Sequence, residues 1–113
     1  MGLENSETID AMGVEKTSGV VVLTILDSWN WHDVDAHLRA LQAKLNTYLD
    51  YITSGKILAD YPQAHERPLR LDILFRFDVP EAANELLETA HDLIASMGFT
   101  LACRKLADPP PTA

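Results

Sequence analysis

Histidine and carboxylate side chains gather at the start of a predicted helix. Asp33 and His37 are four residues apart, so they share one helix face, and His32 is adjacent in sequence. A metal site drawn there lacks third and fourth ligands at supporting spacing, and four-residue spacing of polar groups is common on any helix. We therefore predict no metal and no cofactor at this position.

Two tryptophans, Trp29 and Trp31, lie just before that helix. Tryptophan is enriched at interface hot spots, because it offers a large and rigid contact area. A residue before a helix N-cap also often packs back onto the first turn. We expect one tryptophan in the core and one partly exposed, and we name Trp29, Trp31 and His32 as interaction candidates.

Cys103 is the only cysteine, so no internal disulfide can form. It alternates with Phe99 and Leu101, which predicts a buried, unreactive thiol. The sequence contains neither a glycine-rich phosphate loop nor a serine-centred nucleophile elbow. We assign no catalytic residue.

Hydrophobic periodicity places these side chains on four strands and two helices. Apolar residues alternate along residues 69–77, as in a half-buried strand, whereas residues 20–26 are apolar on both faces, as in a central strand. Apolar residues at three- and four-residue spacing predict helices. The predicted strands are residues 8–15, 20–26, 69–77 and 99–106, and the predicted helices are residues 33–54 and 79–97.

Local signals set the helix ends. Asp33 is a suitable N-cap for the first helix, and Gly55 ends it. For the second helix, Asp78 followed by Glu81 resembles a capping box, and Gly98 follows its last turn. In the 113-residue chain we expect a flexible N-terminal segment at residues 1–7, a single domain at residues 8–106 and a proline-rich tail at residues 107–113. Within the domain, residues 56–66 are predicted to form an irregular connection.

These elements predict an α+β fold of ββαβαβ order, in which both helices cover one face of a four-stranded mixed sheet. The other face would present an apolar strip rimmed by charges, including Val20, Val22, Leu74 and Arg76. Such a strip suits a protein contact, and a symmetric homodimer is the commonest form of one. Partial cover by the N-terminal segment or by residues 56–66 is the alternative.

The formal net charge is −8, from 17 acidic and nine basic residues. A surface of that sign repels phosphate backbones, so we expect no nucleic-acid partner. No apolar run approaches the roughly 20 residues that span a bilayer, and no secretory signal is evident, so we expect a cytoplasmic protein without membrane contact.

The first predicted helix carries the run LQAKLNTYLDYITSG at residues 41–55. This run resembles a family of small bacterial domains of unassigned function, and the likeness extends over most of the chain. The resemblance implies a bacterial cytosolic setting and transfers no catalytic residue.

Two functional hypotheses follow. The first is a non-catalytic protein-interaction domain, in a specific version an immunity or antitoxin-like protein that binds a basic toxin. The second is a small enzyme or ligand-binding protein, with a site formed by the Trp31–His37 segment and residues 56–66.

Overall fold

The computed structural model describes residues 3, 5 and 8–106. It confirms the α+β fold with a four-stranded mixed sheet. The predicted proline-rich tail at residues 107–113 lies outside the described residues. The elements are β1 (Ala11–Val14), β2 (Val21–Asp27), α1 (Val34–Thr53), α2 (Lys56–Asp60), η1 (Pro62–Ala64), β3 (Leu69–Phe75), η2 (Glu81–Ala83), α3 (Asn84–Ser96) and β4 (Thr100–Lys105).

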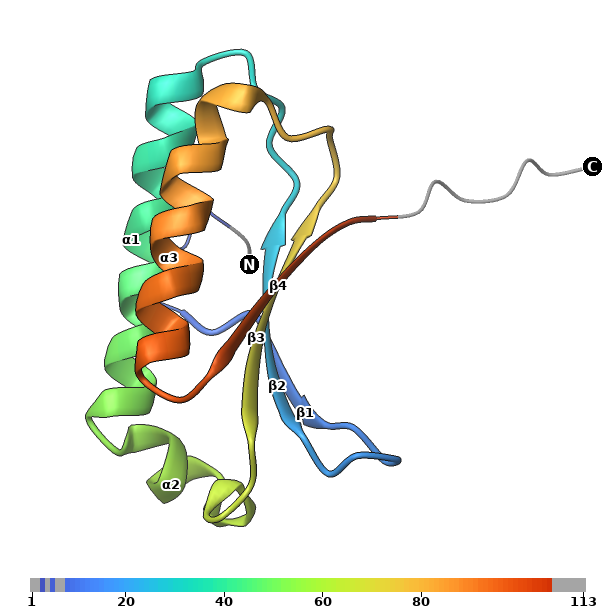
Figure 1. Cartoon of the computed structure of the whole chain (residues 1–113), viewed down its shortest axis with the longest axis vertical. Helices are drawn as coiled ribbons and strands as arrows, with labels where there is room; N and C mark the ends of the chain where they lie inside the picture. The colour runs from blue at the N-terminus through green and yellow to red at the C-terminus, as the bar shows by residue number, and fades with distance from the viewer. Residues whose placement is uncertain (1–2, 4, 6–7, 107–113) are drawn as a thin grey trace, which may run out of the picture.

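The strands lie in the order β1-β2-β3-β4. β1 pairs antiparallel with β2 through a hairpin, whereas β2, β3 and β4 are mutually parallel, as predicted for the last two. Crossovers between parallel strands are right-handed, and both crossovers here step in the same direction across the sheet. α1 and α3 therefore cover the same face, and the other face of the sheet points away from them (Figure 1).

The ends of α1 agree with the sequence signals. The Asp33 carboxylate accepts a hydrogen bond from the backbone N–H of Ala36, as an N-cap does. Gly55 follows the last turn with φ of 83°, in the left-handed region that glycine adopts without strain.

The predicted capping box of the second helix is wrong. Residues 81–83 form a short 3-10 turn, and α3 begins only at Asn84, with no side-chain cap. Pro80 is extended, so Asp78 lies too far upstream to reach the first free N–H groups. The Asp78 carboxylate instead pairs with Lys105 Nζ at 2.8 Å.

The connection at residues 56–66 is not irregular, contrary to the prediction. It contains the short helices α2 and η1. Ile57 is only 2% exposed and fixes α2 to the core, and half-buried Tyr61 also packs against the core.

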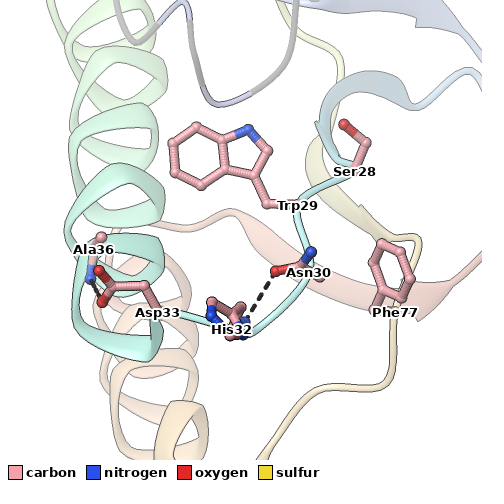
Figure 2. A pocket seen from close by; sticks show the side chains of 7 residues that line it. All are labelled: Ser28, Trp29, Asn30, His32, Asp33, Ala36 and Phe77. Carbon is pink, nitrogen blue, oxygen red and sulfur yellow. Dashed lines mark hydrogen bonds between the residues drawn. The ribbon is translucent and has the colours of Figure 1, made fainter.

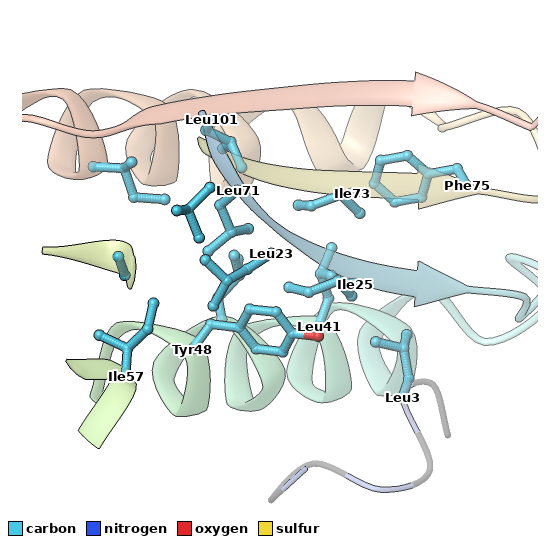
Figure 3. Packing of buried hydrophobic residues seen from close by; sticks show 14 residues of the cluster. Leu3, Leu23, Ile25, Leu41, Tyr48, Ile57, Leu71, Ile73, Phe75 and Leu101 are labelled. Atoms are coloured by element: carbon cyan, nitrogen blue, oxygen red, sulfur yellow. The ribbon is translucent and has the colours of Figure 1, made fainter. Parts of the chain in front are cut away.

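The core fills the space between the sheet and the helices (Figure 3). Alternate residues of β2 and β3 point into it, against Leu41 and Tyr48 of α1. Leu3 also belongs to this cluster, at 2% exposed. Residues 1, 2, 4, 6 and 7 lie outside the described part of the chain. The flexible segment at residues 1–7 therefore stays a prediction, although Leu3 within it is packed in the core.

Cys103 is exposed, so its predicted place in the core is wrong. β4 is an edge strand, and helical cover ends beside it. Partial desolvation raises the pKa of the Cys103 thiol, and Asp72 adds a smaller effect in the same direction. The thiol is therefore less reactive than a freely solvated one.

Candidate functional site

The sheet face opposite the helices, here called the reverse face, has no cover from any described segment (Figure 1). Its residues alternate with the core residues along β2, β3 and β4 and pair across the strands in rows. Val22 lies opposite Arg70, and Leu26 opposite Leu74. The reverse face comprises Ala11, Gly13, Val22, Thr24, Leu26, Arg70, Asp72, Leu74, Ala102 and Arg104.

A network of ion pairs holds the charges of the reverse face. Asp72 is 3% exposed because two arginines cover it. Its carboxylate accepts hydrogen bonds from Arg70 Nε at 2.8 Å and from Arg104 Nη2 at 3.0 Å. Arg70 also pairs with Glu15 at 3.3 Å, and the hydrogen bond to Asp72 is the main cause of its raised pKa. A shallow hollow of about 430 Å³ lies over this network.

Of the predicted contact residues, Val22 and Leu74 both lie on the reverse face and are half-buried, two rows of the sheet apart. Val20 immediately precedes β2 and is also half-buried. Arg76 follows β3, is exposed, and places its guanidinium 5.8 Å from the ring centre of Phe77. Arg76 therefore lies at the carboxyl ends of the parallel strands, beyond the rows of the reverse face.

A second hollow, the carboxyl-edge hollow, lies where the loops after β2 and β3 meet (Figure 2). Its volume is about 530 Å³. Phe77 is 41% exposed there, and sequence reasoning gave it no role beyond the strand. The lining residues are Ser28, Trp29, Asn30, His32, Asp33, Ala36 and Phe77.

A buried histidine and aspartate lie beneath the loop that forms this hollow. His37 and Asp27 are each 1% exposed, and His37 Nε2 lies 2.5 Å from Asp27 Oδ2. His37 Nδ1 lies 2.9 Å from the Asn30 carbonyl oxygen, and Asp27 Oδ1 accepts a hydrogen bond from the Trp29 N–H. Burial raises the pKa of Asp27, and the contact with His37 opposes that rise.

The two tryptophans hold the His37 ring between them. Trp31 stacks on it with ring centres 3.5 Å apart, and Trp29 meets it edge-on at 5.8 Å. Both tryptophans are half-buried, so the prediction of one core tryptophan is wrong. Trp31 Nε1 is buried without a hydrogen-bond partner among the described residues.

This arrangement limits the chemistry of the site. Because His37 and Asp27 are enclosed, neither reaches a ligand in the hollow, and we assign them a positioning role. The proposed combination of the Trp31–His37 segment with residues 56–66 does not form, because α2 lies at the opposite end of α1 (Figure 1). Within residues 3, 5 and 8–106, no three His, Cys, Asp or Glu side chains are grouped to hold a metal ion.

A third polar cluster was missed entirely from the sequence. Lys44 is fully buried, and its Nζ donates to Asp10 Oδ1 at 2.8 Å and to the Asn5 carbonyl oxygen at 2.7 Å. The Tyr48 hydroxyl accepts from the Asp10 N–H and donates to the Thr24 carbonyl oxygen. The available signal was spacing, since Lys44 lies between apolar neighbours on the stripe of α1.

Charge divides sharply between the two layers of the fold. Residues 28–66 and 79–98, here called the helical layer, carry nine acidic and three basic side chains. Residues 8–27, 67–78 and 99–106, the strand layer, carry five acidic and six basic side chains. The negative charge of the described residues therefore lies on the side of the helices.

A family model covers residues 1–107 of the chain. The chain belongs to a family of unknown function, DUF6572. The resemblance inferred from the sequence, to a family without an assigned function, is thereby confirmed. Neither a curated protein nor a solved structure matches the chain. None of the helices in the described part of this family member has the length and apolarity that crossing a bilayer requires.

Proposed function

We propose that this protein is a non-catalytic protein-interaction domain that associates with a second copy of itself through the reverse face. The uncovered sheet carries this proposal, because half-buried Leu26 and Leu74 pair there across β2 and β3, and half-buried Val22 adds a third apolar side chain beyond the row of Thr24 and Asp72. The Asp72 network beside the strip is already paired, so burying it leaves few charges without partners.

The distribution of charge favours this mode of self-association. A chain of net charge −8 repels its own copies, and that repulsion is strongest between helical layers. Sheets pack face to face about 10 Å apart, so the helical layers of such a dimer would be separated by roughly 20 to 30 Å. That separation exceeds the Debye length of about 8 Å at physiological salt, so the remaining repulsion is small.

The size of the reverse face sets the expected strength. Four strands about 4.8 Å apart, with about 3.3 Å per residue, give a face on the order of 400 Å² per copy. Two such faces bury less than the roughly 1,600 Å² of a standard interface. We therefore expect a weak, reversible dimer.

Analytical ultracentrifugation over a range of protein concentrations tests the proposal. Leu74→Asp should weaken dimerisation at least tenfold, because a carboxylate would be buried between the sheets, while Arg104 beside it in the register keeps the monomer folded. The matched control is Leu93→Asp, at a residue 50% exposed on α3, which should dimerise like the wild type. Equal dimerisation of both variants, or a wild type that is monomeric at millimolar concentration, would contradict the proposal.

An immunity or antitoxin-like role is the specific version that the helical layer supports. In a dimer formed through the reverse faces, both acidic helical layers remain exposed, and charge complementarity speeds encounter with a basic protein. We place this role in the cytoplasm of a bacterial cell, since the resemblance of the α1 run implies that setting and a single cysteine suits a reducing compartment. Subcellular fractionation of the native cell checks the location.

A further inference from the structure

We propose that the carboxyl-edge hollow is a second binding site, which takes an arginine or lysine side chain from a basic protein segment. The inference is independent of dimerisation through the reverse face, because the hollow lies at the ends of the strands and leaves the rows of the sheet untouched. Its support is the combination of two aromatic side chains, Trp29 and Phe77, with an acidic surround.

Buried groups hold the Trp29 side of the hollow in place. Asp27 Oδ1 accepts the Trp29 N–H, and the Trp29 ring packs edge-on against His37, which is itself fixed by Asp27 and by the stack with Trp31. Across the hollow, Phe77 is 41% exposed, two residues after the end of β3 (Figure 2). Aromatic side chains that are already ordered lose little entropy when a ligand binds.

The surround carries negative charge for a structural reason. Crossover helices run antiparallel to the strands, so α1 and η2 both begin at the carboxyl edge, and acidic residues favour helix starts. Asp33 lines the hollow and caps α1 with Oδ1, and Asp35 and Glu81 lie in the first turns of their helices. Arg76 is a basic residue beside the hollow, with its guanidinium 5.8 Å from the ring centre of Phe77. The three carboxylates outnumber this charge and offset the positive helix end, so a cation is favoured there over an anion.

A cationic side chain of a protein fits this chemistry. A guanidinium or ammonium group is attracted to the face of an aromatic ring and to a carboxylate together, and a planar guanidinium also stacks. The acidic helical layer next to the hollow would attract the rest of a basic segment.

Isothermal titration with a synthetic hexa-arginine peptide tests the site. We expect saturable binding that Phe77→Ala and Trp29→Ala each weaken at least tenfold. Phe77→Ala does not touch the packing around His37, so it keeps the test valid if Trp29→Ala fails to fold. The same titration on Leu74→Asp should give unchanged affinity, which separates this site from dimerisation.

A matched pair of charge variants separates a defined site from general attraction to an acidic protein. Asp33→Asn keeps a good N-cap and removes one charge from the hollow, and we expect a three- to tenfold loss of affinity. Asp92→Asn removes one charge from α3, where the side chain is 86% exposed, and should change affinity less than twofold. Equal losses in the two variants, or equal binding of a hexa-glutamate peptide, would overturn the proposal.

Discussion

The two faces of the sheet pair their charges in different ways. On the helix side, Lys44 with Asp10 and His37 with Asp27 are enclosed, with side chains no more than 1% exposed. On the reverse face, Asp72 is buried only by arginines that themselves meet solvent, since the Arg104 side chain is 63% exposed. The enclosed pairs are shut off from solvent, whereas the network on the reverse face keeps contact with water through its arginines.

The largest expected effect is at Lys44. Replacing Lys44 by Met leaves the Asp10 carboxylate buried without the ammonium group, and breaking a buried pair in this way costs about 3–5 kcal/mol of unfolding free energy. Urea denaturation followed by circular dichroism measures the loss. Lys56→Met, at an exposed position of α2, is the matched control and should change stability by less than about 0.5 kcal/mol.

Loss of the Asn5 contact makes the Lys44 prediction more specific. Because Lys44 Nζ also binds the Asn5 carbonyl oxygen, the N-terminal segment should lose its attachment in Lys44→Met. Amide hydrogen exchange should then accelerate around residues 8–10 more than in β3. Uniform acceleration across the domain would show instead that Lys44 supports the whole core equally.

A smaller and pH-dependent effect is expected at His37. His37→Phe keeps a ring between the tryptophans but removes the partner of Asp27, at a cost of about 2 kcal/mol near neutral pH. The pKa of Asp27 is already raised by burial, so in this variant the folded state takes up a proton more readily than the unfolded state does.

The sign of the pH dependence follows from that raised pKa. The contribution of Asp27 to stability is present below its unfolded pKa of about 3.9 and is lost as pH rises through its folded pKa. His37→Phe should therefore gain stability on acidification relative to the double variant Asp27→Asn/His37→Phe, which lacks the carboxyl group. Parallel stability curves of the two variants between pH 7 and 4.5 would contradict this assignment.

On the reverse face, the equivalent charge removal should cost less. Asp72→Asn leaves Arg70 and Arg104 without a charged partner, but both guanidinium groups have access to water, so we expect a loss of about 1 kcal/mol. Chemical denaturation at low and high salt checks this, since screening should shrink the loss. A cost as large as that of Lys44→Met would show that both faces depend equally on their ion pairs.

The contrast between the faces also explains what the sequence could predict. Alternation along β3 and the apolar stripe of α1 report burial on one side of an element, and local periodicity is enough to identify them. Periodicity did not predict the burial of Lys44 and His37, because that burial depends on pairing with Asp10 and Asp27, which are distant in sequence. Pairing across the fold is a tertiary property, and one sequence does not display it.

Two other errors have local causes. Residues 56–66 form the short helices α2 and η1, with Ile57 packed on the core, whereas their mixture of apolar and polar residues around Pro62 predicted an irregular connection. The prediction for Cys103 assumed that alternation implies burial on every strand, whereas an edge strand meets the margin of the helix layer. The carboxyl-edge hollow was only half predicted, because Trp29 and His32 were named without Phe77 from the following loop.

Cys103 offers the smallest and most local test of where the helical cover ends. Partial desolvation raises the pKa of the Cys103 thiol although the residue is exposed. An ordinary thiol is half ionised near pH 8.5. The rate of Cys103 alkylation by iodoacetamide should therefore keep rising above that pH. The midpoint of the rate profile, unlike its height, does not depend on steric access. Asp72→Asn should move that midpoint slightly downward, because Asp72 is the second cause of the shift. A midpoint equal to that of the urea-unfolded chain would contradict this. It would mean that the helices do not desolvate β4, so that both faces of the sheet are equally open to solvent at this edge.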